Sequence, residues 1–282
     1  MRHLFAAVLG LALGLALAFL LLPLAAIFLQ VPPGEILDQL TGEVARQALW
    51  VSLRTNLIAD AVILGVGTPA AYLVASRRRF PGRRVVLTLL ELPLVLPPAV
   101  AGIGLLAAFG RAGLLGGQLE ALGVTLPFTQ AAVIVAIVFV AGPFYLRQAV
   151  SAFESVDPRL VQAARTLGAG PGRAFWRVAL PLAGGGLAAG WALAFARGMG
   201  EFGATIIFAG NFEGVTQTLP LAVYAQFDQD FDTALAIGAL LIVVSGAVLL
   251  AVKLIPAWTR LPFSTPTSAS PSGPSSSASA PR

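Results

Sequence analysis

The stretch VQAARTLGAGPGRAFWRVALP, residues 161–181, interrupts a chain that is otherwise dominated by long apolar runs. It carries three arginines and a cluster of residues that break helices, namely Gly168, Gly170, Pro171 and Gly172. A slack linker between two apolar runs would not need this density of charge and turn residues. We therefore predict that the stretch folds into a structure of its own, outside the apolar part of the protein.

Two short helices are predicted in this region. Asp157-Pro158 matches an N-cap followed by a proline at the first helical position, so a first helix begins there. Gly168 ends it, because glycine tolerates the left-handed backbone of a helix end. Pro171 begins a second helix with the sequence GRAFWRVAL, and Pro181 is expected to separate that helix from the next apolar run.

The composition of the chain is that of a membrane protein. Of its 282 residues, 57% are hydrophobic and only 11% are charged, whereas a soluble domain has about 25% charged residues. The net charge of +5 comes from bases in short loops and not from the concentrated patch that nucleic-acid binding needs. Cysteine is absent and His3 is the single histidine. These counts exclude a disulfide framework, a thiol nucleophile and a histidine-based catalytic or metal site.

Six apolar runs are long enough to cross a membrane, since a spanning helix needs roughly 20 apolar residues. They cover about residues 4–29, 57–76, 85–109, 128–147, 182–208 and 233–255. The first run has 26 residues, more than the 7–15 of a signal-peptide core, so we expect a retained helix. The sequence thus predicts an all-α membrane protein with six transmembrane helices in one domain, 1–263. The Ser/Pro-rich segment 264–282 is predicted to be a disordered tail.

The charges of the loops predict the orientation. The N-terminus, the loops 77–84 and 147–181 and the C-terminal end hold 14 of the 18 Lys and Arg residues, whereas the alternate loops hold eight acids. Positively charged loops stay on the cytoplasmic side. We therefore expect a multi-pass protein of the cytoplasmic (inner) membrane with both termini in the cytoplasm.

The spacing of the interruption resembles the coupling loop of ATP-binding-cassette importer permeases. That pattern is Glu-Ala-Ala, three residues, Gly, nine residues and Ile-x-Leu-Pro. The matching residues are Gln162, Ala163, Ala164, Gly168, Val178, Leu180 and Pro181. Gln in place of Glu removes a carboxylate that could pair with a base of the partner. The resemblance implies that the loop, about residues 150–181, docks on a separate ATPase subunit. An amphipathic helix pair lying on membrane lipid is the alternative.

The chain carries no ATPase of its own. A phosphate-binding P-loop needs Gly-x-x-x-x-Gly-Lys-Ser/Thr, and the single lysine, Lys253, has no glycine at the required spacing. We expect ATP and Mg²⁺ on the partner, no cofactor bound by this chain, and a transport subunit and not an enzyme.

The third run contains three prolines, Pro93, Pro97 and Pro98, inside LELPLVLPPAVAGIGLLAAFG, residues 90–110. Proline lacks an N–H and clashes with the preceding turn, so the helix must bend or open. Irregular backbone at membrane depth is tolerated only where protein or a water-filled cavity satisfies it. The prolines therefore mark a candidate transport pathway, with a packing kink as the alternative.

The fifth run ends in ARGMGEFGATIIFAGN, residues 196–211, with Arg197 and Glu201 one turn apart. A lone charge at the bilayer centre costs about 2.5–3.5 kcal/mol on insertion scales, so the two should pair or face an aqueous lumen. A structural ion pair and a role in the pathway are both compatible with this. The pathway candidates here are Arg197, Glu201, Gly203, Thr205 and Asn211.

Together, LPLVLPPAVAG, the coupling loop and GEFGATIIFAGN…TQTLPLAVY resemble the permease subunit of molybdate importers, in the molybdate/sulfate permease family. The resemblance runs in order from about residue 49 to 250. It implies a homodimer of six-helix subunits with the pathway on the two-fold axis. Two ATPase subunits would dock inside, and an extracytoplasmic binding protein would deliver the oxyanion, molybdate or tungstate.

Two alternatives remain. The same architecture could carry sulfate or thiosulfate, since sulfate permeases share the GEFG element. An ion-gradient transporter, in which Asp60, Glu91 and Glu201 relay protons, would belong to a different class, but it has no use for a coupling loop.

Several acids need an explanation of their own. Asp60 has no predicted partner, and Glu91 is expected to lie near Arg83 and Arg84. The acids Asp228, Asp230 and Asp232 form a possible docking face for a binding protein, or a plain solvated loop.

Overall fold

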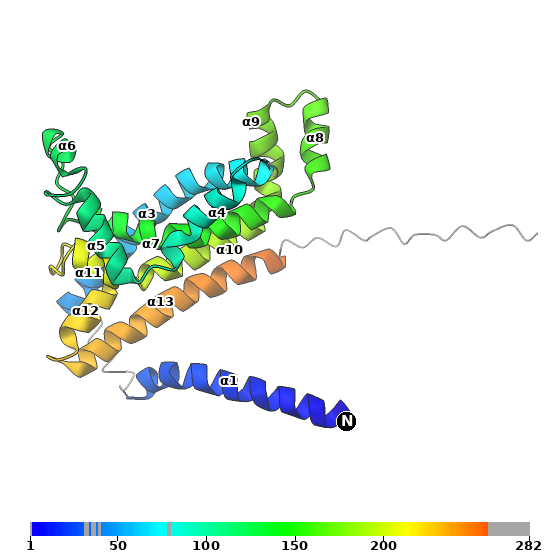
Figure 1. Ribbon diagram of the computed structural model, residues 1–282. Helices are drawn as coiled ribbons and strands as arrows, with labels where there is room; N and C mark the ends of the chain where they lie inside the picture. Colours follow the sequence, from blue (N-terminus) through cyan, green and yellow to red (C-terminus); the bar gives the residue numbers. More distant parts are fainter. Residues whose placement is uncertain (1, 31–33, 35–37, 39–40, 78–79, 259–282) are drawn as a thin grey trace, which may run out of the picture.

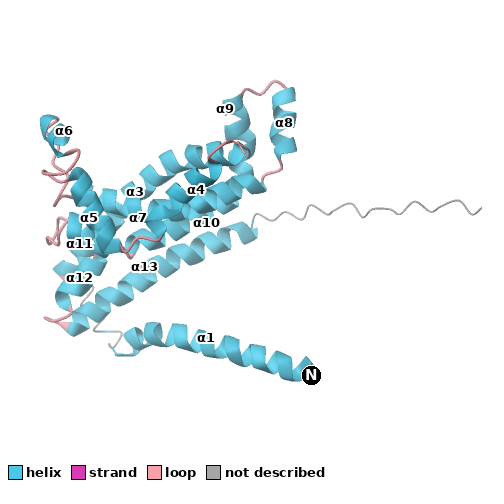
Figure 2. Ribbon diagram, viewed as in Figure 1, coloured by secondary structure: helices cyan, strands magenta, loops and turns pink. Residues whose placement is uncertain are grey.

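A computed structural model describes residues 2–30, 34, 38, 41–77 and 80–258. Within these ranges every regular element is a helix (Figure 2). The elements are α1 (Arg2–Gln30), α3 (Glu43–Ser76), α4 (Arg83–Glu91), η1 (Leu92–Leu94), α5 (Pro98–Phe109), α6 (Gly116–Ala121), α7 (Gln130–Ser155), α8 (Pro158–Thr166), α9 (Pro171–Ala174), the π-helical turn η2 (Phe175–Ala179), α10 (Leu180–Met199), α11 (Gly203–Phe208), α12 (Leu219–Gln226) and α13 (Phe231–Trp258).

The described residues contain five continuous helices that are long and apolar enough to cross a membrane. These are α1, α3, α7, the continuous run from α9 through α10, and α13. A sixth span is formed if α4 with η1 and α5 are counted together, since they pass the same test but meet at an angle of 108°. The predicted all-α fold with six spans is therefore confirmed, with the third span sharply bent where its prolines lie.

The centre of the bundle consists of α3, α7 and α10, which lie side by side in Figure 1. Their contacts are made by small residues such as Ala59, Ala136, Ala141 and Ala183, all almost completely buried. Small side chains let helices approach closely, which is how helices associate when lipid is as apolar as the core. Helix α13 packs against α10, and α1 lies beside α13. No residue of α1 is buried.

The predicted bounds differ most from the structure at the second and fifth spans. The second span is much longer than 57–76, because α3 begins at Glu43. The fifth predicted span, 182–208, is not one helix: α10 ends at Met199 and α11 begins at Gly203. Glycine lowers helix stability by roughly 1 kcal/mol relative to alanine, and three glycines in this short segment allow the break. The predicted tail, 264–282, lies outside the described residues.

Pro181 does not separate two helices, contrary to the prediction. The helix is continuous from Pro171 to Met199, and the turn before the proline is π-helical, with the Leu180 N–H donating to the Phe175 carbonyl five residues back. The widened turn has already shifted the hydrogen-bond ladder, and proline, which lacks an N–H, is tolerated in the first turn that follows. The coupling loop is thus joined to α10 without a break.

Asp60 has a partner that the sequence did not reveal. Asp60 is 2% exposed, and the Trp191 indole N–H of α10 donates to its Oδ2 at 2.9 Å. On the same face of α3, Asn56 Nδ2 donates to the Phe195 carbonyl at 3.2 Å, and Ser52 Oγ accepts from the Leu219 N–H at 2.7 Å. This polar stripe fastens α3 to α10 and α12.

Replacing Trp191 by Phe should destabilise the protein by roughly 1–3 kcal/mol, because the buried Asp60 carboxyl loses its donor. A thermal unfolding curve of the detergent-solubilised protein measures the change. Trp176→Phe is the matched control, because that indole is 66% exposed, and it should leave the midpoint unchanged. Equal stability of the two variants would contradict a structural role for the Asp60–Trp191 hydrogen bond.

Candidate functional site

The two predicted helices of the coupling loop are present, as α8 and α9, and they project from one end of the bundle in Figure 1. Asp157 caps α8, since its Oδ1 accepts from the Arg159 N–H at 2.8 Å. Gly168 has a φ of 86°, the left-handed conformation that favours glycine. No other atom lies within 4 Å of the position that a Cβ would take there. Glycine is therefore required at 168 by the backbone and not by crowding.

An apolar stripe on α8 is exposed. Leu160, Ala163 and Leu167 are spaced i, i+3 and i+7 and so share one face of the helix. Leu160 is 49% exposed and Leu167 88% exposed, so neither leucine is packed by the rest of the chain. We call these three residues the docking stripe. Exposed leucines on a helix that projects from the bundle form a candidate contact surface for another protein.

The remaining coupling-loop residues divide into two groups. Gln162 lines a groove of about 350 Å³ between α8 and the bundle, together with Arg165, Tyr72 and Phe153. Ala164, Val178 and Leu180 are half-buried, and Pro181 is exposed. The first half of the motif thus presents a surface, whereas the second half lies in or next to the π-helical turn that joins the loop to α10.

The broken spans meet at the opposite end of the bundle. A Cβ on Gly203 would lie 2.7 Å from the Pro98 Cβ, and one on Gly102 would lie 2.9 Å from the Ala204 carbonyl oxygen. The half-helices α5 and α11 therefore run parallel and in close contact, with their N-termini together. Helix N-termini carry a partial positive charge, and half-helices that begin inside a membrane are a recurring device for holding anions.

Glu201 forms the corner between α10 and α11. It is 1% exposed; its Oε1 accepts from the Ala204 N–H at 2.8 Å, and its Oε2 lies 2.7 Å from Arg197 Nη2. The predicted ion pair is confirmed. The pair has a structural role, because Glu201 connects Arg197 at the end of α10 with the Ala204 N–H at the start of α11.

The other pathway candidates are spread along these elements. Pro97 precedes α5 and Pro98 begins it, whereas Pro93 lies in η1, on the other side of the bend. Thr205 is completely buried in α11. Asn211 follows the C-terminal end of α11, where its Nδ2 donates to the Leu221 carbonyl at 3.4 Å. The structure brings together Pro98, Gly203 and the Arg197–Glu201 pair. Pro93 lies outside this group, before the bend that precedes α5, and Asn211 lies outside it, beyond the C-terminal end of α11.

Glu91 pairs with a residue other than those expected. Its Oε1 lies 3.7 Å from Arg147 Nε of α7, whereas Arg83 pairs with Glu154. Arg83 and Arg84 begin α4 and Glu91 ends it, which separates them by about 12 Å at 1.5 Å per residue. The expected proximity is wrong for this reason.

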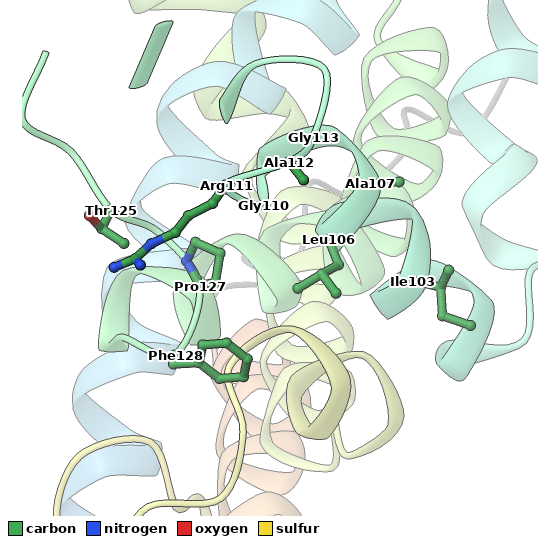
Figure 3. A pocket seen from close by; sticks show the side chains of 10 residues that line it. All are labelled: Ile103, Leu106, Ala107, Gly110, Arg111, Ala112, Gly113, Thr125, Pro127 and Phe128. Atoms are coloured by element: carbon green, nitrogen blue, oxygen red, sulfur yellow. The ribbon is translucent and has the colours of Figure 1, made fainter. Parts of the chain in front are cut away.

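A cavity of about 720 Å³ opens at the C-terminal end of α5 and was not predicted. In Figure 3 the Arg111 side chain extends toward Thr125 and Pro127. The other walls include Ile103, Leu106 and Phe128. Apart from Arg111 and Thr125 the walls are apolar, and apolar groups do not replace the water around an oxyanion.

The sequence matches the family of binding-protein-dependent transport system inner membrane components over residues 67–258. The chain belongs to this family. The matched region contains the coupling loop and both broken spans, whereas α1 lies outside it. This inner membrane component is a multi-pass membrane protein and a transport subunit, not an enzyme.

Similar proteins include the molybdenum transport system permease protein ModB of Mycobacterium tuberculosis, 43% identical over 236 residues that cover 84% of this chain and 89% of the relative. The probable sulfate transport system permease protein cysT of Chlorokybus atmophyticus is 33% identical over 219 residues, covering 77% of this chain and 76% of the relative. Among solved structures, a bacterial alginate ABC transporter with its periplasmic protein matches with a TM-score of 0.69 at 16% identity, covering 89% of this chain and 93% of that chain. This last likeness shows the fold alone.

Proposed function

We propose that the chain is the membrane subunit of an ATP-driven importer that moves molybdate into the cell. The observation that carries the proposal is the 43% identity to a molybdenum permease along 84% of the chain. Tungstate has the same charge and nearly the same size, and it is expected to follow the same route. The chain itself binds no cofactor, because ATP and Mg²⁺ are held by the partner ATPase.

The ATPase docks on α8 in this proposal. The docking stripe supports this, because Leu160 and Leu167 are exposed on a short helix that projects from the bundle. The N-cap at Asp157 and the left-handed Gly168 hold α8 at a defined angle. The arginines of this loop favour the cytoplasmic side, which is where ATP is available. With six spans both termini lie on the same side as this loop, so we expect both in the cytoplasm.

A homodimer completes the pathway. The face of α5 that is turned away from α11 is exposed and apolar or small, including Val100 and Ile103, which are 48% and 58% exposed. A second copy packed on this face would place two pairs of half-helices, α5 and α11, around one axis. The two α5 N-termini together would offer partial positive charge to a divalent oxyanion, whereas the Ala204 N–H of α11 already donates to the Glu201 carboxylate.

In this proposal the binding protein docks at the end of the bundle opposite α8, where α13 begins. Asp228, Asp230 and Asp232 are all exposed before or at the start of α13. The hydroxyl and backbone N–H of Thr233 donate to Asp230 and hold the pKa of that carboxyl below its ordinary value. Asp230 therefore stays charged, and a negative loop suits a binding protein with a positive rim and not the free anion.

The two alternatives have less support. The sulfate permease relative is less similar, at 33% identity, than the molybdenum permease. A proton relay through Asp60, Glu91 and Glu201 is disfavoured, because each carboxylate is held by its own partner: Trp191, Arg147 and Arg197.

Gly168→Val should uncouple transport from ATP hydrolysis. A β-branched residue at a φ of 86° costs about 1–3 kcal/mol, which reorients the end of α8 while nothing nearby is displaced. The measurement is ATP-dependent molybdate uptake by the assembled transporter at equal membrane level of the protein. Gly170→Val is the matched control, because Gly170 has an ordinary φ of −63°. Normal ATP-dependent uptake by Gly168→Val would contradict the proposal that this loop couples transport to ATP hydrolysis.

Deleting the chain in its host should lower cellular molybdenum selectively. Cells are grown with limiting molybdate, tungstate or sulfate, and the three elements are measured by mass spectrometry, with a complemented strain as control. A fall in molybdenum or tungsten is expected, because the importer is needed only when the anion is scarce. A fall in sulfur alone would move the chain to the sulfate branch.

A further inference from the structure

Two ion pairs connect α4 with α7, and the proposed function does not use them. Arg83, the first residue of α4, pairs with Glu154 near the end of α7. Glu91, the last residue of α4, lies 3.7 Å from Arg147 of α7. The pairs therefore sit at the two ends of one short helix.

The spacing of the pairs matches the geometry of two antiparallel helices. The paired positions are eight residues apart on α4 and seven apart on α7, which corresponds to about 12 Å and about 10 Å at 1.5 Å per residue. Both pairs can thus form at once with α4 lying straight along α7. Two attachments at opposite ends fix both the position and the direction of a helix, which a single contact cannot do.

The pair at the cytoplasmic end also includes α3. The Arg83 side chain is 22% exposed, and its Nε donates to the Val74 carbonyl near the end of α3 at 3.5 Å. The Glu91–Arg147 pair is more open, with side chains 46% and 71% exposed. Exposed ion pairs contribute little to stability, so the arrangement is better explained by orientation than by the energy of folding.

The pairs lie between the two sites described above. Glu154 is three residues before Asp157, which caps the coupling helix α8. Glu91 directly precedes η1, the 108° bend and the N-terminus of α5, which is packed against Gly203 of α11. A displacement of α8 can thus reach α5 through two ion pairs and one short helix, in addition to the packing of α7 against η1 and α5.

We propose that Arg83–Glu154 and Glu91–Arg147 make α4 move as one body with α7, so that a displacement of α8 by the ATPase is delivered to the half-helix α5. The four side chains are positioning residues and do not touch the cargo. The proposal rests on the proposed function, since it needs an ATPase on α8 and a pathway at α5.

Charge reversal tests the pairs in the transporter reconstituted with its ATPase and binding protein. Arg83→Glu and Arg147→Glu should each lower molybdate uptake per ATP hydrolysed by about fivefold or more, within the range of coupling between distant sites. The swapped pairs Arg83→Glu/Glu154→Arg and Glu91→Arg/Arg147→Glu should recover uptake to within about twofold. Arg84→Glu, an exposed neighbour with the same change of charge, is the control.

Single variants that behave like Arg84→Glu, or swapped pairs that are no better than the single variants, would overturn the proposal. Absence of ATP-dependent uptake in the unaltered complex would instead contradict the proposed function, so the two failures are distinguishable.

A distance measurement tests whether α4 moves together with α7, even if the charge-reversal variants do not fold. The chain has no cysteine, so spin labels can be attached at Thr88→Cys on α4 and Ser151→Cys on α7, both exposed positions. The distance between the labels should be the same in the nucleotide-free and ATP-bound complex. A change on ATP binding would show that α4 moves apart from α7 and would overturn the proposal.

Discussion

The rest of the structure depends on the close contact of two broken helices, where Gly203 lies against Pro98. In a membrane every backbone polar group must find a partner within the protein, so helices can be interrupted only where other elements cover the break. Here α11 packs against α5, and at the second break the Glu201 carboxylate accepts from the Ala204 N–H, whereas Val95, Pro97 and Pro98 at the first break are exposed in the single chain. The result is a pair of adjacent half-helix N-termini, that of α11 buried at Ala204 and that of α5 exposed at Pro98.

A transporter must connect such a site with a source of energy at the other end of the molecule. Two connections run along the bundle. One is continuous helix, from α9 through the π-helical turn into α10, which ends at the Arg197–Glu201 corner. The other runs along α7 and α4 to the bend before α5. The coupling loop therefore has a route to each of the two half-helices, and both routes are short and made of regular secondary structure.

The sequence predicts local structure well in this protein and contacts between helices poorly. Apolar length gives the spans, and Asp157-Pro158 and Gly168 give the ends of α8, because these features depend on nearby residues. The Asp60–Trp191 hydrogen bond joins residues 131 positions apart, and no local pattern marks it. Ser52, Thr55, Asn56 and Asp60 do share one helical face, a polar stripe that could have been recognised as a contact surface. Hydropathy does not predict the break at Gly200, because it averages over the glycines, and composition does not predict the continuous helix through Pro181, because it carries no signal for a π-helical turn.

The most direct test of the account is transport in a defined system. The chain, its ATPase and its binding protein are reconstituted in liposomes, and uptake of radioactive molybdate is measured with ATP, with a non-hydrolysable analogue and with ionophores that collapse ion gradients. The account predicts uptake that requires ATP hydrolysis, is unaffected by ionophores and is competed by tungstate but not by sulfate. Uptake that continues without the ATPase, or that stops when the ion gradient is removed, would contradict it.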